Sequence, residues 1–83
     1  MTYTKKISSD IYFFKDKLDK QDYRSQPAVN IVKDGDKYNV FRTSIYYSKY
    51  EKRIITGNGW NLYKNLNHKE AISAARSALK YLK

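Results

Sequence analysis

The stretch NHKEAISAARSALKYL, residues 67–82, is the part of the chain whose structure the sequence defines most clearly. Asn67 is a good helix N-cap, and Glu70 three positions later completes a capping box. Apolar side chains recur at the spacing of one helical face; they are Ile72, Ala75, Leu79 and Leu82. The sequence therefore predicts a helix from about residue 68 to residue 82 that packs one side against a sheet.

Upstream of this helix, apolar stretches separated by turn residues are typical of antiparallel strands. Three strands are predicted, over residues 28–33, 38–47 and 52–56. Asp34-Gly35-Asp36 and Gly57-Asn58-Gly59 are predicted turns, because glycine accepts the positive φ that hairpin turns need. The alternation of apolar and polar side chains in residues 60–63 indicates either a short fourth strand or an ordered loop.

Residues 8–21 are predicted to form a first helix. Ser8 or Ser9 can cap it, and Ile11, Phe14 and Leu18 recur on one helical face. The alternative is a strand over residues 11–14, since aromatic side chains favour strands. Pro27 disfavours helix at the residue before it, so residues 23–27 are predicted to be a loop.

These elements predict a small α+β domain with the order α-β-β-β-α. Its antiparallel sheet would have three or four strands, and both helices would pack on one face of it, because each offers one apolar stripe. A chain of 83 residues has room for a single domain. The expected domain spans residues 1–83, with an ordered core at about residues 7–82.

The residue inventory argues against several classes of function. There is no cysteine and only one histidine, His68, so disulfides, thiolate metal sites and multi-histidine metal sites are not expected. His68 would begin a helix and has no evident catalytic partners. We therefore expect a protein that is not an enzyme and needs no cofactor or metal.

The sequence also bears on location. It contains no stretch of about 20 apolar residues, and its start does not resemble a signal peptide. No membrane association is expected. The absence of cysteine is compatible with a reducing cytoplasm. Abundant Lys, Tyr, Ile and Asn, whose codons are AT-rich, point to a low-GC bacterium or its phage, so a cytoplasmic location in such a cell is expected.

Charge is the strongest signal in the composition. The chain has 17 Lys and Arg against 8 Asp and Glu, which gives a net charge of +9. Residues 37–83 alone contain ten basic and two acidic side chains. Such a one-sided field attracts polyanions and speeds their encounter with the protein. The alternative is a charge that serves only solubility.

Two groups of side chains are candidates for contact with a polyanion. Lys69, Arg76 and Lys80 share one line of the last helix, which suits contact with phosphates, although a solvated face is the ordinary alternative. Residues 46–53 interleave aromatic and basic side chains that could stack on bases while cations hold the backbone; the candidates are Tyr46, Lys49, Tyr50, Lys52 and Arg53. Arg42 is expected on the sheet face away from the helices.

The order of elements resembles the double-stranded RNA-binding domain, over residues 9–82. The resemblance rests on Pro27 before the first strand, Gly57-Asn58-Gly59 after the third, and Lys69-Glu70-Ala71 leading into an alanine-rich helix. It implies that Lys69 grips a phosphate. Residues 29–82 also look like the N-terminal arm-binding domains of phage-type integrases, which read DNA through a three-stranded sheet.

Together these observations favour a basic nucleic-acid-binding module, with DNA and RNA both open as ligands. The alternative is a phage or mobile-element protein that inhibits a host protein, for example a nuclease, by binding an acidic surface.

Overall fold

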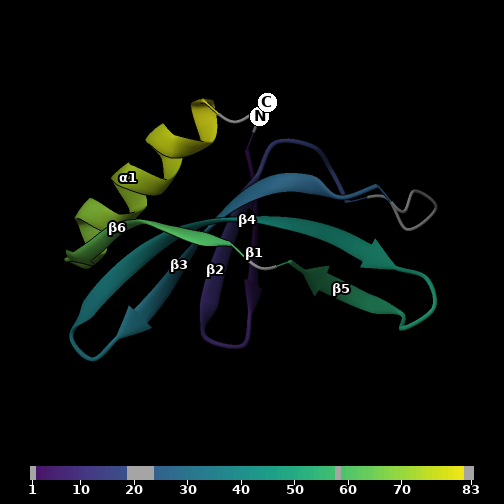
Figure 1. Ribbon diagram of the computed structural model, residues 1–83, viewed down its shortest axis with the longest axis horizontal. Coiled ribbons are helices and arrows are strands. Elements are labelled where there is room, and N and C mark those ends of the chain that lie inside the picture. The colour runs from purple at the N-terminus through teal and green to yellow at the C-terminus, as the bar shows by residue number, and fades with distance from the viewer. Residues whose placement is uncertain (1, 19–23, 58, 82–83) are drawn as a thin grey trace.

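A computed structural model describes residues 2–18, 24–57 and 59–81 of the chain. They form a curled antiparallel sheet and one C-terminal helix (Figure 1). The elements are β1 (Tyr3–Ile7), β2 (Asp10–Phe14), β3 (Gln26–Asp34), β4 (Lys37–Ser48), β5 (Arg53–Thr56), β6 (Trp60–Leu66) and α1 (His68–Lys80). No helix among these residues is long and apolar enough to cross a membrane.

The sheet follows the chain order β1-β2-β3-β4-β5, and β6 also pairs with β4. β4 is long enough to hold both β5 and β6 on one side. Its last four residues, from Ile45 to Ser48, pair with β5, and the stretch from Tyr38 to Arg42 pairs with β6. Gly59, the residue before β6, lies so close to β4 that a Cβ there would overlap the carbonyl oxygen of Arg42. This position therefore requires glycine.

The predicted helix at residues 8–21 is wrong, because this stretch begins with the turn and the second strand of the β1–β2 hairpin. Ile7 pairs with Asp10 across a turn in which Ser8 has a φ of 56°. The three consecutive residues from Tyr12 to Phe14 are all buried. Neighbouring residues on a strand point to opposite faces, so a strand buried on both faces can use such a run, whereas one side of a helix cannot. The sheet is consequently larger than the three or four strands expected; residues 19–21 lie outside the described residues.

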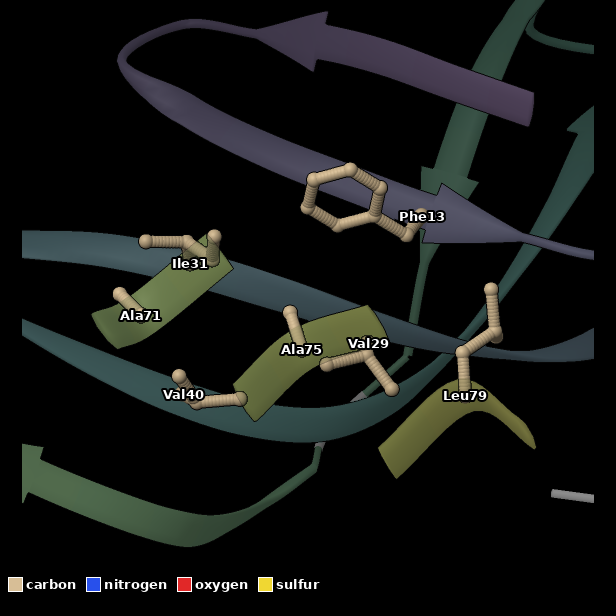
Figure 2. Close-up of a cluster of buried hydrophobic side chains, with 7 residues drawn as sticks. All are labelled: Phe13, Val29, Ile31, Val40, Ala71, Ala75 and Leu79. Atoms are coloured by element: carbon tan, nitrogen blue, oxygen red, sulfur yellow. The ribbon is translucent and has the colours of Figure 1, made fainter. Parts of the chain in front are cut away.

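The face of the sheet under α1 holds one hydrophobic core (Figure 2). Ala71, Ala75 and Leu79 of the helix face the sheet. They meet a layer of side chains from three strands, namely Phe13, Val29, Ile31 and Val40. The alanines are fully buried, and their small side chains allow α1 to lie close to β3 and β4.

The opposite face holds a second core. Its buried members are Tyr12, Phe14, Ala28 and Ile45. No helix among the described residues covers this face. Burial comes instead from the curl of the sheet, which brings Tyr3 of β1 and Ile54 of β5 onto the same cluster. The sheet therefore has a core on each face and encloses the second one largely by itself.

The strands and the helix predicted downstream of residue 27 are confirmed at the level of elements, whereas Asn58 of the predicted turn at residues 57–59 lies outside the described residues. The strand at 28–33 extends to Gln26–Asp34, so the predicted loop at residues 23–27 is wrong at Gln26 and Pro27, which pair with β4. Residues 60–63 belong to a fourth strand of that region, β6. The capping box is present, since Asn67 Oδ1 accepts from the Glu70 backbone N–H at 2.8 Å and Glu70 Oε1 accepts from the Asn67 N–H at 3.3 Å. The helix ends at Lys80, while the predicted end at residue 82 lies outside the described residues.

Candidate functional site

An open groove of about 530 Å³ separates the two outer strands of the curled sheet, β1 and β5. We call it the β1–β5 groove. It lies on the face away from α1, because Phe14 lines it whereas its neighbour Phe13 belongs to the core beneath the helix. Four cationic side chains surround the groove; they are Lys5, Lys17, Lys52 and Arg53. No acidic side chain is among its described lining residues.

The floor of the groove is aromatic and apolar. Tyr3 stacks on Phe14, with ring centroids 5.9 Å apart and an interplanar angle of 15°. Tyr47 and Ile54 face each other across the β4–β5 pair and line the same groove. Phe14 is 4% exposed, whereas Tyr3 and Tyr47 are half-buried, so part of each tyrosine remains exposed to solvent.

Local hydrogen bonds position the segment that follows β2. Gln26 Oε1 accepts from the backbone N–H of Asp16 at 2.9 Å, and Gln26 Nε2 donates to the Asp16 carbonyl oxygen at 2.6 Å. This two-way contact ties the segment to the start of β3. It places Lys17 and Leu18 beside Tyr47, where they line the groove.

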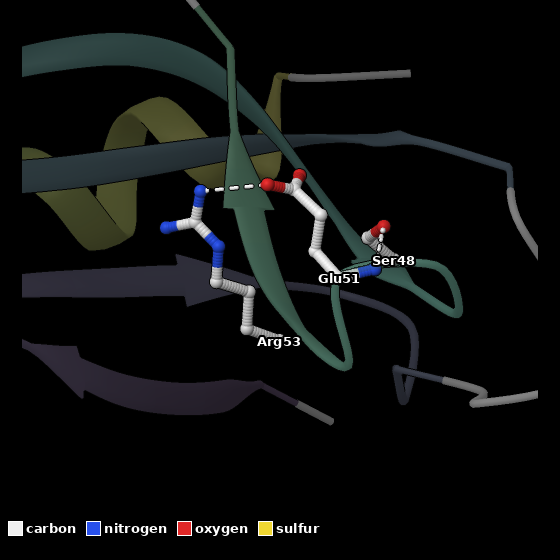
Figure 3. A network of polar contacts seen from close by, with 3 residues as sticks. All are labelled: Ser48, Glu51 and Arg53. Carbon is white, nitrogen blue, oxygen red and sulfur yellow. Dashed lines mark hydrogen bonds and ion pairs between the residues drawn. The ribbon is translucent and has the colours of Figure 1, made fainter.

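The β4–β5 hairpin positions the other two cations (Figure 3). Ser48 Oγ accepts from the backbone N–H of Glu51 at 3.1 Å, and the Glu51 carboxylate accepts from Arg53 Nη2 at 3.0 Å. Both Glu51 and Arg53 are largely exposed, so this ion pair orients the guanidinium more than it stabilises the fold. Lys52 closes the turn with a φ of 56°, a left-handed conformation that is unfavourable for lysine.

A second basic hollow lies on the other face of β1, beside the C-terminal end of α1. We call it the helix-end pocket; its volume is about 600 Å³. Lys15, Arg76 and Lys80 line it, together with one carboxylate, Asp16. Lys15 Nζ donates to the Lys80 carbonyl oxygen at 3.4 Å, a favourable position for a cation at a helix C-terminus. Thr4 borders both this pocket and the β1–β5 groove, so the two hollows flank β1.

The structure brings together some of the residues predicted to bind a polyanion and separates others. Lys52 and Arg53 lie in the groove, and Arg76 and Lys80 lie in the helix-end pocket. The remaining five candidates line neither hollow; they are Arg42, Tyr46, Lys49, Tyr50 and Lys69. Lys69 and Lys80 are eleven residues apart on α1, which corresponds to about 16 Å.

Arg42 lies on the face opposite to the one expected. It pairs with Val29, which packs beneath α1, so Arg42 projects to the helix side of the sheet. Its guanidinium carbon lies 4.7 Å from the ring centroid of Trp60, in a cation–π contact. Trp60 is 57% exposed and thus lies at the surface, although tryptophan more often lies in or at the edge of a core.

The tyrosines of residues 46–50 do not form one surface. Tyr46 and Tyr47 are neighbours on β4 and therefore point to opposite faces, and only Tyr47 lines the groove. Tyr50, at the hairpin tip, is 93% exposed. It is the residue of this group whose side chain is most accessible for contact.

Sequence reasoning missed Lys5, Lys15 and Lys17, which lie in the half of the chain whose overall charge is nearly balanced. Their grouping depends on the β1–β2 hairpin, whose second strand lies in the stretch predicted to be a helix. The signal that could have found them is the run of apolar residues from Ile11 to Phe14. Interpreted as a strand buried on both faces, this run would have placed the lysines that flank it in the sequence near both faces of the sheet.

Within the described parts of the chain, no group of three or more His, Asp or Glu side chains could hold a metal ion. Comparisons with protein-family models, with curated proteins and with solved structures found no match.

Proposed function

We propose that this protein is a nucleic-acid-binding module. Its phosphate-binding surface runs from the helix-end pocket across β1 into the β1–β5 groove. The observation that carries the proposal is the segregation of charge along this path. Seven cations line the two hollows against one lining carboxylate, Asp16, and Glu51 lies beside the groove in an ion pair with Arg53. Most protein surfaces mix the two signs, whereas proteins that bind nucleic acids concentrate cations on one surface.

The arrangement suits a polyanion that follows a path rather than a single anion. Lys15, Arg76 and Lys80 lie on one side of β1, and Lys5 and Lys17 lie on the other. An anion with regularly spaced charges can contact cations in both hollows at once. Each phosphate that is neutralised releases counterions, so binding should weaken steeply as salt is added.

The test is a titration of labelled DNA and RNA by fluorescence anisotropy at several salt concentrations. With five to seven phosphate contacts, the slope of log K against log salt should be about −4.5 to −6 on duplex DNA. Arg76→Glu/Lys80→Glu should weaken binding by about tenfold or more and make the slope shallower by roughly two.

The matched control is Lys33→Glu/Lys37→Glu, which changes the net charge by the same amount. Both lysines are exposed beside the β3–β4 turn and line neither hollow. The control should retain most of the affinity. Equal losses in the two double variants would mean that total charge, and not this surface, drives binding. Absence of binding to any nucleic acid at low salt would refute the proposal.

A second candidate function is inhibition of another protein, such as a host nuclease, through an acidic segment of that protein. It is favoured by one observation: among the described strands, β1 pairs only with β2 and β5 pairs only with β4. Strands with an unpaired edge can accept an extended peptide as an additional strand. Pull-down of a defined acidic peptide, with no binding to DNA or RNA, would favour this function over the first.

A further inference from the structure

The β1–β5 groove is a gap in the curled sheet and not a closed seam. Strands that pair in an antiparallel sheet have Cα atoms about 4.5–5.5 Å apart. Among the described residues, no Cα atom of β1 lies within 8 Å of a Cα atom of β5. Side chains of both strands nevertheless line one groove, so the two edges face a common space. That space is accessible from solvent and ends on the second hydrophobic core.

Chemistry changes with depth in this groove. At the rim, the side chains of Lys5, Lys17 and Lys52 are exposed. Tyr3 and Tyr47 line the same groove and are half-buried, so they lie deeper in it than the lysines. A ligand that fits this order carries regular negative charge outside and flat apolar groups inside.

We infer that the β1–β5 groove binds an unpaired stretch of nucleic acid and gives the protein a preference for single strands over duplexes. This inference rests on the proposed function and names its ligand class. In a duplex the base faces are stacked on one another and cannot reach Tyr3 or Tyr47. An unpaired base can stack on a tyrosine while its phosphates stay at the lysine rim, as in proteins that bind single strands with little sequence preference.

The helix-end pocket has a different character, which provides the control. Its described lining has cations but no tyrosine or tryptophan, and the one aromatic residue, Phe13, is 5% exposed. This pocket can hold phosphates of either kind of nucleic acid. Charge reversal there should lower affinity without changing the choice between strands.

The experiment compares a labelled thymidine oligonucleotide of about 15 nucleotides, within the site sizes of single-strand binders, with a duplex of equal length at one salt concentration. The wild-type protein should bind the single strand at least about tenfold more tightly, the difference that one stacked base can supply. Lys5→Glu/Lys52→Glu should reduce this ratio toward one. Arg76→Glu/Lys80→Glu should weaken both ligands by similar factors and leave the ratio unchanged.

The outcomes separate the inference from the function on which it rests. Equal affinities, or a preference for the duplex, would overturn the groove assignment while nucleic-acid binding stands. No binding to either ligand would remove both. Poly-glutamate and unlabelled oligonucleotide should each be tested as competitors of the labelled oligonucleotide. If poly-glutamate displaces it at a lower concentration than the unlabelled oligonucleotide does, the occupant is an acidic peptide and the inference is overturned. The wild-type ratio decides even if a variant misfolds, and circular dichroism checks the fold of each variant.

Discussion

The two faces of the sheet are closed in different ways. On one face α1 lays Ala71, Ala75 and Leu79 directly on the strands. On the other face the described residues contain no covering element, and the curl of the sheet brings β1 and β5 toward each other. A separate helix can seal a core completely, whereas a sheet that curls without pairing its edges leaves a gap. The unsealed face is therefore the one that offers a ligand both apolar surface and backbone edges.

Phe13 and Phe14 provide the largest test of this comparison, because they are neighbours that serve opposite faces. Both are almost fully buried. Phe→Ala substitutions in cores cost about 3–5 kcal/mol. Phe13 packs with six other buried side chains, three of them from α1, whereas Phe14 packs with three. Each also borders a hollow, the helix-end pocket for Phe13 and the β1–β5 groove for Phe14. We therefore expect Phe13→Ala to lie near the upper end of this range and Phe14→Ala near the lower end.

Urea unfolding followed by circular dichroism measures both free energies of unfolding. Domains of this size are marginally stable, so Phe13→Ala is expected to be largely unfolded without a stabilising osmolyte. Equal costs for the two substitutions would mean that the groove side is packed as tightly as the helix side.

The second largest effect is expected at the N-terminus of α1. A substitution there tests how much the capping box helps to hold the helix on its face of the sheet. Asn67 caps the helix through its contact with the Glu70 backbone. Asn67→Ala should lower the free energy of unfolding by about 1 kcal/mol. Ser77→Ala, at an exposed position of the same helix, is the control and should change it by less than about 0.5 kcal/mol. A negligible effect at Asn67 would show that packing alone holds α1 in place.

Lys52 gives the smallest effect and separates stability from binding on the open face. Because its φ is 56°, Lys52→Gly removes an unfavourable backbone conformation and should raise the free energy of unfolding by about 0.5–1 kcal/mol. The same substitution removes a rim cation and should weaken single-strand binding a few-fold. Lys33→Gly in β3, where φ is not positive, should be destabilising by roughly 0.5–1 kcal/mol. Loss of stability at Lys52 would contradict this account of the turn.

Sequence patterns predicted the covered face better than the open one. Two local signals predicted the helix within residues 67–82, namely the capping box and the spacing of Ile72 and Leu79. Neither signal depends on distant contacts. Turn residues in the sequence marked where each of the strands from β3 to β6 begins or ends. Both kinds of signal act within a few residues, which is why they could be interpreted without a structure.

The N-terminal hairpin could not be predicted in the same way. Ile11, Phe14 and Leu18 satisfy helical spacing, yet the run from Ile11 to Phe14 is equally suited to a strand buried on both faces. What decides between them is the second core, made by β2, β3 and β4 together with the curl of the sheet. The clustering of Lys5 and Lys17 with Lys52 follows from that tertiary choice, so the local pattern left the composition of the site open between a helix and a strand.

β4 has a consequence for motion. It pairs along one side with β3 and along the other with β5 and β6, while β1 has a single described neighbour. Elements with more partners open less often, so we expect the amide hydrogens in the middle of β4 to exchange with solvent most slowly and those of β1 to exchange early. One wall of the groove would then open locally while the central strand stays paired. A single-stranded nucleic acid could then enter and leave the groove from the side, without its free end having to pass along the groove.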